Sequence, residues 1–290
     1  MTTPGVVRLE ADGLDDFLLD ASTGVVVTEL DLGFPAVREV VDERPDVDGE
    51  DDTSSLFGAR AVSITAAVVP VGAITRRAVL DRISSFLRLG LEVYVYWDDE
   101  DDGDERRMKV RVDQFRRPIN SRGAYVQVGW RAPDGVQEAA LVTTETAAAT
   151  VADEGGRVYP RSYPWSYADS DPIGVVEVTN DGNVRTYPVL RLYGPCTNPR
   201  IENRTVAKAL EFGNSDFGDL TLVAGEYVEI DTRERTVLLG GITTQSRRER
   251  LDDDVSQWWA LEPGVNVVRY YPESFESGAE AVITYRSCWL

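Results

Sequence analysis

The chain contains one stretch, residues 75–89, in which apolar positions recur at helical spacing. Thr75 is a favourable N-cap because its hydroxyl can accept a hydrogen bond from a free first-turn amide, and Gly90 follows where a left-handed C-cap residue is favoured. The apolar residues of the shared face are Val79, Ile83, Phe86 and Leu87. We therefore predict one helix here, packed on a sheet.

Alternating apolar and polar positions dominate the rest of the first half. Residues 91–97 and 108–113 alternate between two faces and flank the acidic segment 98–105, which predicts a long hairpin with a charged tip. Further strands are predicted at 25–27, 59–69 and 124–130. The acidic residues 42–55 include a proline and a glycine, and they predict an exposed loop.

The pattern changes at residues 138–172, where an Ala/Thr-rich stretch gives way to glycine, proline and aromatic residues, as in a stiffened linker. Beyond it, short strands alternate with turns about every ten residues, which is typical of an all-β sandwich. These strands are predicted at 175–178, 189–193, 220–223, 227–230, 236–239, 265–270 and 281–285. We predict a mostly β protein: an α+β domain over 1–137, a linker over 138–172 and a β-sandwich over 173–290.

Composition narrows the classes of partner. A chain of 290 residues suits two domains at roughly 150 residues each, and its 42% hydrophobic content is ordinary for a globular protein. Its net charge of −20 argues against nucleic-acid binding, which depends on clusters of lysine and arginine, and against docking on anionic lipid. We expect no membrane partner.

The cysteines and the N-terminus bound the cellular context. Cys196 and Cys288 lie far apart and form no CxxC motif, so no metal cluster or redox pair is indicated. We expect two reduced, buried thiols, although a bridge between them stays open. The first residues lack the features of a signal peptide, and no apolar stretch has the length of a membrane span. We expect synthesis in a cytoplasm.

Catalytic chemistry is poorly represented. The chain has no histidine, which excludes Ser-His-Asp and Cys-His catalysis and histidine-ligated metals. It has no phosphate-binding glycine loop. The segment that starts at Asp98 has Asp102 and Gly103 where a calcium loop needs them, but Lys109 stands where its bidentate glutamate belongs. We expect no enzyme activity, no catalytic or metal-binding residue and no cofactor.

Two aromatic clusters admit a second interpretation. Trp258-Trp259 and the group Tyr163, Trp165 and Tyr167 have the side chains of a sugar-stacking platform. Because aromatic residues bury large areas, packing in a core or an interface is the commoner use. Carbohydrate contact therefore stays as the alternative.

The chain contains the motif YGPCTNP, Tyr193 to Pro199, within the region 187–270. This motif is the most specific of several that resemble those of minor tail proteins from siphophages of actinobacteria. Other similar segments are Phe57 to Val62, Gly225 to Thr232, Trp258 to Asn266 and Tyr285 to Leu290. The resemblance covers most of the chain and points to the family of distal tail proteins.

This resemblance implies an N-terminal belt domain, of the β-sandwich or split-barrel type, that closes a hexameric ring, and a C-terminal galectin-like β-sandwich. Such a ring at the tail tip of the virion joins the tail tube to the tip or baseplate, leaves a channel for DNA and contacts tube, tape measure and hub proteins. The alternative is an accessory tail protein that binds carbohydrate of the host wall. We expect ring closure to reside in residues 1–137.

Overall fold

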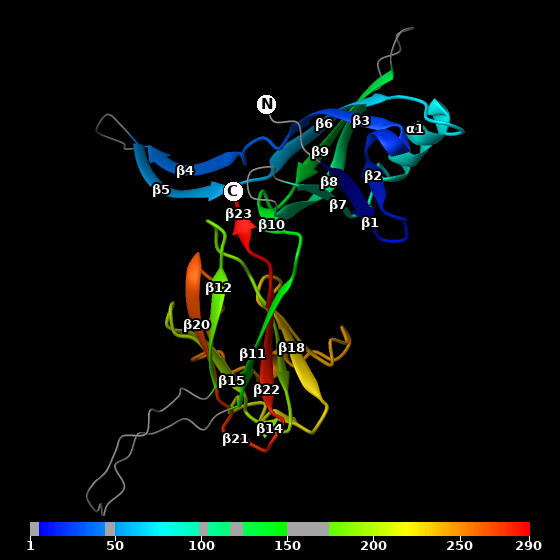
Figure 1. Ribbon diagram of the computed structural model, residues 1–290. Coiled ribbons are helices and arrows are strands. Elements are labelled where there is room, and N and C mark those ends of the chain that lie inside the picture. Colours follow the sequence, from blue (N-terminus) through cyan, green and yellow to red (C-terminus); the bar gives the residue numbers. More distant parts are fainter. Residues whose placement is uncertain (1–5, 44–49, 99–103, 117–123, 150–173) are drawn as a thin grey trace, which may run out of the picture. The chain divides into compact units, whose positions relative to one another are not determined.

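The computed structural model describes residues 6–43, 50–98, 104–116, 124–149 and 174–290. The chain divides into two compact units (Figure 1). The first unit comprises residues 1–141 together with 289–290, and the second comprises 142–288. Each unit has its own hydrophobic core.

The first unit is built on one antiparallel sheet. Its strands run in the order β2-β1-β7-β8-β9-β6-β3, and β10 pairs with β8 and with β23 (Cys288–Trp289). The elements of this unit are β1 (Val7–Ala11), β2 (Phe17–Leu19), η1 (Ala21–Thr23), β3 (Val25–Asp31), β4 (Val37–Glu43), β5 (Glu50–Phe57), β6 (Arg60–Val68), α1 (Arg76–Ser85), β7 (Val93–Asp98), β8 (Glu105–Arg116), β9 (Ala124–Ala132) and β10 (Gln137–Ala139). Alternate residues of β1 and β6 are buried, as a sheet with one covered face requires.

The helix α1 covers this core. The Thr75 hydroxyl accepts a hydrogen bond from the amide of Ala78 at 3.2 Å, which confirms the predicted N-cap. The helix ends at Ser85, earlier than the expected residue 89, and Phe86 is fully buried and stacks on Phe17 of β2 with ring centroids 6.3 Å apart. No helix in the described parts of the chain is long and apolar enough to cross a membrane.

The predicted long hairpin is confirmed. The strands β7 and β8 pair antiparallel from Val93–Val110 to Asp98–Glu105. Their inward side chains include Val95 and Met108, which are buried in the core. The acidic tip between the two strands lies mostly outside the described residues.

The interpretation of residues 42–55 as a loop is wrong. Most of them belong to β4 and β5, which pair antiparallel with each other as a separate two-stranded sheet (Figure 1). A ribbon of two strands has no face that must be covered by a core, so its sequence need not alternate between apolar and polar residues. The charge that predicted a loop is compatible with such a ribbon.

The second unit is a β-sandwich. A five-stranded sheet, β11-β22-β13-β18-β19, and a four-stranded sheet, β12-β20-β15-β16, contribute to a single core, and β17-β14-β21 forms a small third sheet. The elements are β11 (Thr143–Ala148), β12 (Val175–Asn180), β13 (Val189–Tyr193), β14 (Cys196–Thr197), β15 (Arg200–Asn203), β16 (Lys208–Glu211), β17 (Thr221–Leu222), β18 (Tyr227–Asp231), β19 (Thr236–Leu239), η2 (Arg248–Arg250), β20 (Gly264–Tyr270), β21 (Ser274–Phe275) and β22 (Glu280–Tyr285).

The start of the expected linker is also corrected. Residues 143–148 form β11, which pairs with β22 over its full length inside the second unit. The strand was missed because its one fully buried residue is a small one, Ala147, which gives only a weak apolar alternation. The rest of the expected linker, residues 150–172, lies outside the described part.

The chain also returns to the first unit near its C-terminus. Trp289 and Leu290 belong to that unit. The Arg106 guanidinium lies 4.5 Å from the centroid of the Trp289 ring, and the Gln137 side chain donates a hydrogen bond of 3.4 Å to the Leu290 carbonyl. The second unit is therefore inserted between β10 and the last strand of the first.

Candidate interaction surface

The base of the β4–β5 ribbon carries an exposed apolar cluster, which we call the hairpin-root patch. It consists of Phe34, Val37 and Phe57, which are 64%, 50% and 50% exposed. The two phenyl rings meet edge to face with centroids 5.9 Å apart, and Val37 lies opposite Phe57 in the register. Clustered large apolar side chains on a surface mark an interaction site more often than scattered ones do.

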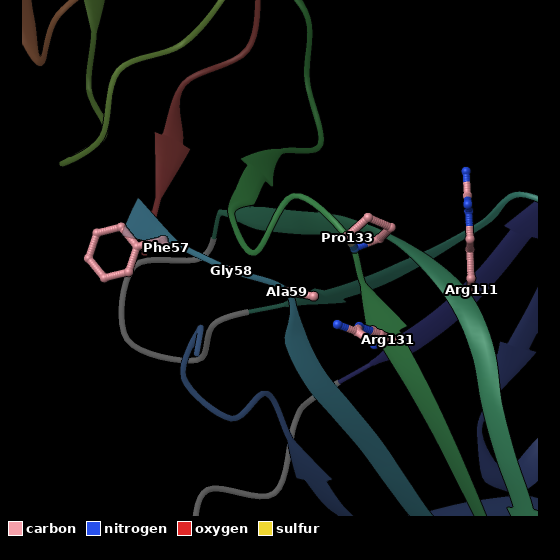
Figure 2. A pocket seen from close by; sticks show the side chains of 6 residues that line it. All are labelled: Phe57, Gly58, Ala59, Arg111, Arg131 and Pro133. Atoms are coloured by element: carbon pink, nitrogen blue, oxygen red, sulfur yellow. The ribbon is translucent and has the colours of Figure 1, made fainter. Parts of the chain in front are cut away.

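A cavity of about 480 Å³ adjoins this patch. Figure 2 shows the side chains that line it, with Phe57 at the end of β5 and Arg111 and Arg131 on the neighbouring strands β8 and β9. Gly58, Ala59 and Pro133 complete the lining. We call this the arginine pocket, because two cations and an apolar wall suit a carboxylate carried on a hydrophobic segment.

The two arginines of the pocket lie directly opposite each other in the register of β8 and β9. Like charges at opposite positions destabilise a strand pair. Neither side chain forms a hydrogen bond or a close ion pair with a described residue, and Arg111 interacts with Glu92 only through a longer-range electrostatic attraction. Nearby cations on the same face of β8 are neutralised at short distances, Arg107 by Glu138 at 2.9 Å and Lys109 by Glu92 at 2.7 Å.

A third arginine, Arg60, is buried at the start of β6. It is 1% exposed, and its Nε and Nη1 atoms have no hydrogen-bond partner in the described part of the chain. Desolvation lowers the pKa of its guanidinium below the usual value. An unpaired buried charge costs several kcal/mol, so Arg60 destabilises the isolated protomer.

The β4–β5 ribbon has unpaired edges. Each of its strands has a single neighbour among the described residues. The register places Asp42 opposite Asp51 and Glu43 opposite Glu50. Free strand edges invite pairing with another chain. The ribbon is therefore better suited to an assembly than to a free protomer.

The residues singled out from the sequence are placed as follows. Both cysteines are free and buried, as predicted. Trp259 is buried in the core of the second unit, whereas Trp258 is partly buried against that core with the Arg248 guanidinium 4.9 Å from its ring centroid. The group Tyr163, Trp165 and Tyr167 lies outside the described residues.

Metal-binding chemistry is not indicated in the described residues, among which no three acidic or cysteine side chains gather in a way that could hold an ion. The central part of the former calcium-loop candidate, residues 99–103, lies outside them. The arginine pocket was missed in the sequence because the register that places Arg111 opposite Arg131 is visible only in the folded sheet.

Comparison with known proteins gives a consistent result. Residues 181–289 match the family described as siphovirus-type tail component, C-terminal domain. The Dit protein of phage SPP1, described as a paradigm of the hub of the adsorption apparatus in phages that infect Gram-positive bacteria, has 16% identity and a TM-score of 0.62 over 98% of this chain and 100% of that chain. No curated protein matches the chain in sequence.

Two structures of the phage P2 baseplate in its activated conformation, one with Ca and one with Sr, contain a similar chain. Each has 11% identity and a TM-score of 0.51, and each alignment covers 96% of this chain and 97% of the other. At these identities the likeness shows a shared fold, and it extends over nearly the whole chain rather than the C-terminal part alone.

Proposed function

We propose that this chain is a distal tail protein of the siphovirus Dit family, and that six copies close into a ring joining the tail tube to the tail tip. The protein is a structural component of the tail tip and not an enzyme. The ring proposal rests on two features of the first unit. The hairpin-root patch is apolar and exposed, and the β4–β5 ribbon has free strand edges.

The charge distribution supports a head-to-tail contact. In each copy the negative end of the ribbon lies six register positions from Phe57, which is about 20 Å at the rise of a β-strand. Phe57 lines the arginine pocket, so the acidic end of the ribbon lies too far along the strand to fill the pocket of its own copy. A contact between two different surfaces, such as this end of the ribbon and the arginine pocket of a neighbour, closes into a ring when its rotation suits.

The partners follow from this position in the tail. The ring would contact the tail tube protein and the tape measure protein on one side and tip or hub proteins on the other. The similarity of Tyr193 to Pro199 to minor tail proteins supports an actinobacterial host. Ring closure is assigned to the first unit, which holds the ribbon and the arginine pocket, with the second unit as an appended module.

The channel of the ring would carry DNA without binding it. A net charge of −20 supports an acidic lining, because like charge on both surfaces prevents the counterion release that drives adhesion. A filter-binding assay with duplex DNA at moderate salt tests this, and we expect no retention. Tight binding, or a lumen dominated by arginine, would contradict the proposed channel.

The ring itself is tested by particle mass and by rotational symmetry in negative-stain images of the purified chain. We expect six-fold particles that form more readily as salt screens the net repulsion. Phe57→Asp should leave protomers, because it places a charge in the apolar patch. Phe217→Asp is the matched control, since Phe217 is 58% exposed and lies in the second unit.

The outcomes separate the possibilities. A ring of another symmetry would contradict the hexamer. Loss of the ring in Phe217→Asp but not in Phe57→Asp would assign closure to the second unit. Arg131→Glu should weaken the ring and Arg88→Glu should not, because both change the net charge equally but only Arg131 lines the pocket.

A further inference from the structure

The second unit contains a cavity whose charge opposes that of the chain. This cavity, which we call the basic pocket, has a volume of about 430 Å³. Its cationic lining residues are Arg185, Lys208, Arg233 and Arg235, against a single carboxylate, Glu262. The whole chain has 50 acidic and 30 basic residues, so a cavity with four cations and one acid departs strongly from its average composition.

Three of the cations are available to a ligand. Arg185, Lys208 and Arg235 are exposed, and their side chains form no ion pair or hydrogen bond with the described residues. They come from three separate segments of the second unit: the stretch before β13, the start of β16 and the turn between β18 and β19. The fold therefore gathers cations that are distant in sequence.

Hydrogen bonds hold the walls of the pocket in place. Thr186 and Leu261 exchange two backbone hydrogen bonds of 2.9 and 2.8 Å, which fix the segment of Arg185 beside that of Glu262. The Thr232 hydroxyl donates to the Pro188 carbonyl at 2.7 Å. Since little ordering is left for a ligand to impose, binding in such a pocket loses less free energy to immobilisation.

The backbone at Arg235 is unusual. Arg235 closes the turn between β18 and β19 with a φ of +56°. This left-handed conformation favours glycine, and a residue with a longer side chain adopts it at a cost. The turn therefore keeps a cation in the lining of the pocket at a position where glycine would be more stable, and such outliers are a recognised sign of function.

Aromatic side chains form another part of the lining. Trp258 is partly buried and Tyr187 is 43% exposed. An aromatic ring offers a flat apolar surface and, in tyrosine and tryptophan, a polar group at one edge. The C–H face of a sugar ring packs well on such a surface through dispersion contacts. Cations beside aromatic rings suit a ligand that is both a sugar and an anion.

We propose that the basic pocket binds an anionic saccharide, a sugar ring that carries a carboxylate or a phosphate. The sugar packs against Trp258 and Tyr187, and the anionic group pairs with Arg235 and Lys208. The volume lies within the range of roughly 300–1,000 Å³ typical of small-ligand pockets. This binding site is independent of ring closure, because all of its residues belong to the second unit.

Calorimetric titration of the purified full chain tests the proposal with four probes. Trigalacturonate carries carboxylates and glucose 1-phosphate carries a phosphate, so these two separate the sources of the anion. Maltotriose is a neutral sugar, and tri-aspartate is an acidic peptide. We expect one or both anionic sugars to bind, with affinity that falls as salt rises, and maltotriose and tri-aspartate to bind at least tenfold more weakly. Equal binding of tri-aspartate would overturn the saccharide assignment in favour of an acidic polypeptide.

Variants sharpen the test. Arg235→Gly should weaken binding of the anionic sugar at least tenfold while the melting temperature rises by a few degrees, because glycine relieves the backbone strain. A merely structural role for Arg235 would give the rise without the loss. Trp258→Ala should weaken binding of the anionic sugars, and Arg88→Glu should leave that binding unchanged. No binding of either anionic sugar at millimolar concentration would overturn the proposal, whether or not the ring forms.

Discussion

The two units treat buried polar groups in opposite ways. In the second unit the side chains of Asn180, Asn203 and Asn266 are fully buried, and each amide both donates and accepts hydrogen bonds. In the first unit the one buried polar side chain among the described residues is Arg60, whose Nε and Nη1 atoms have no partner. The second unit therefore pairs its buried amides within a single chain, whereas the first carries a buried guanidinium that an assembly could satisfy.

Buried neutral donors do not account for the difference between the two units. Each unit has one buried indole N–H without a partner, that of Trp130 in the first and that of Trp259 in the second. An unpaired neutral donor costs roughly 1–3 kcal/mol, so these two contributions nearly cancel. The difference between the units lies in the unpaired guanidinium, together with the ribbon and the hairpin-root patch.

The largest effect is expected from Asn203→Ala in the second unit. Asn203 donates to the Ala260 carbonyl at 3.2 Å and to the Asn266 side chain at 3.3 Å, and it accepts from the Thr205 amide at 3.1 Å. Its removal should cost about 3 kcal/mol of unfolding free energy, because buried partners lose their hydrogen bonds. Urea unfolding measures this, with the exposed Gln257→Ala as a control expected within about 0.5 kcal/mol of wild type.

The second effect has the opposite sign. Arg60→Met should stabilise the unassembled first unit by about 1–3 kcal/mol, because it replaces an unpaired buried charge by an apolar side chain of similar size. The measurement is urea unfolding in the Phe57→Asp background, which is expected to keep the protomers apart. A loss of stability would mean that the guanidinium has a partner in the protomer, and the contrast between the units would fail.

A smaller effect compares one kind of ion pair in both units. Arg107–Glu138 in the first unit and Arg191–Glu229 in the second both have a 2.9 Å contact. The side chains of Arg107 and Glu138 are 16% and 20% exposed, whereas those of Arg191 and Glu229 are 46% and 23% exposed. Glu138→Gln should cost about 1 kcal/mol and Glu229→Gln less than about 0.5 kcal/mol, since exposed pairs are screened by water. Equal losses would show that burial does not distinguish the two pairs.

The smallest effect depends on pH. The hydrogen bond from Lys109 lowers the pKa of Glu92 below its usual value. A carboxylate with a lowered pKa in the folded state stabilises the protein above its unfolded-state pKa, and this contribution disappears as the pH falls through the folded-state pKa. Glu92 is half exposed, so Glu92→Gln should cost only about 0.3 kcal/mol at pH 7 and low salt. The difference from wild type should vanish in strong acid and in high salt.

Local signals predicted the elements that bury a face. The N-cap at Thr75 and the β7–β8 hairpin were visible because packing on a core imposes a period on the sequence. The β4–β5 ribbon has no core to cover, and β11 buries chiefly one alanine, so neither carries that period.

The candidate sites were harder to predict than the fold. Both the arginine pocket and the basic pocket bring together side chains from separate strands and turns. Their existence depends on register and on the packing of loops, which a single sequence does not display. The resemblance to a family was accessible from the motif at Tyr193 to Pro199, whereas these two cavities were not.

The return of the chain to the first unit has a consequence for biosynthesis. Gln137 of β10 and its hydrogen-bond partner Leu290 are 153 residues apart. At a synthesis rate of roughly 5–20 residues per second, the ribosome adds the residues between them in about 10–30 s. During that delay the first unit lacks its last strand, while the intervening sandwich is still emerging. The first unit is thus finished only after the sandwich of the second unit has been made, so an interrupted chain lacks a complete first unit.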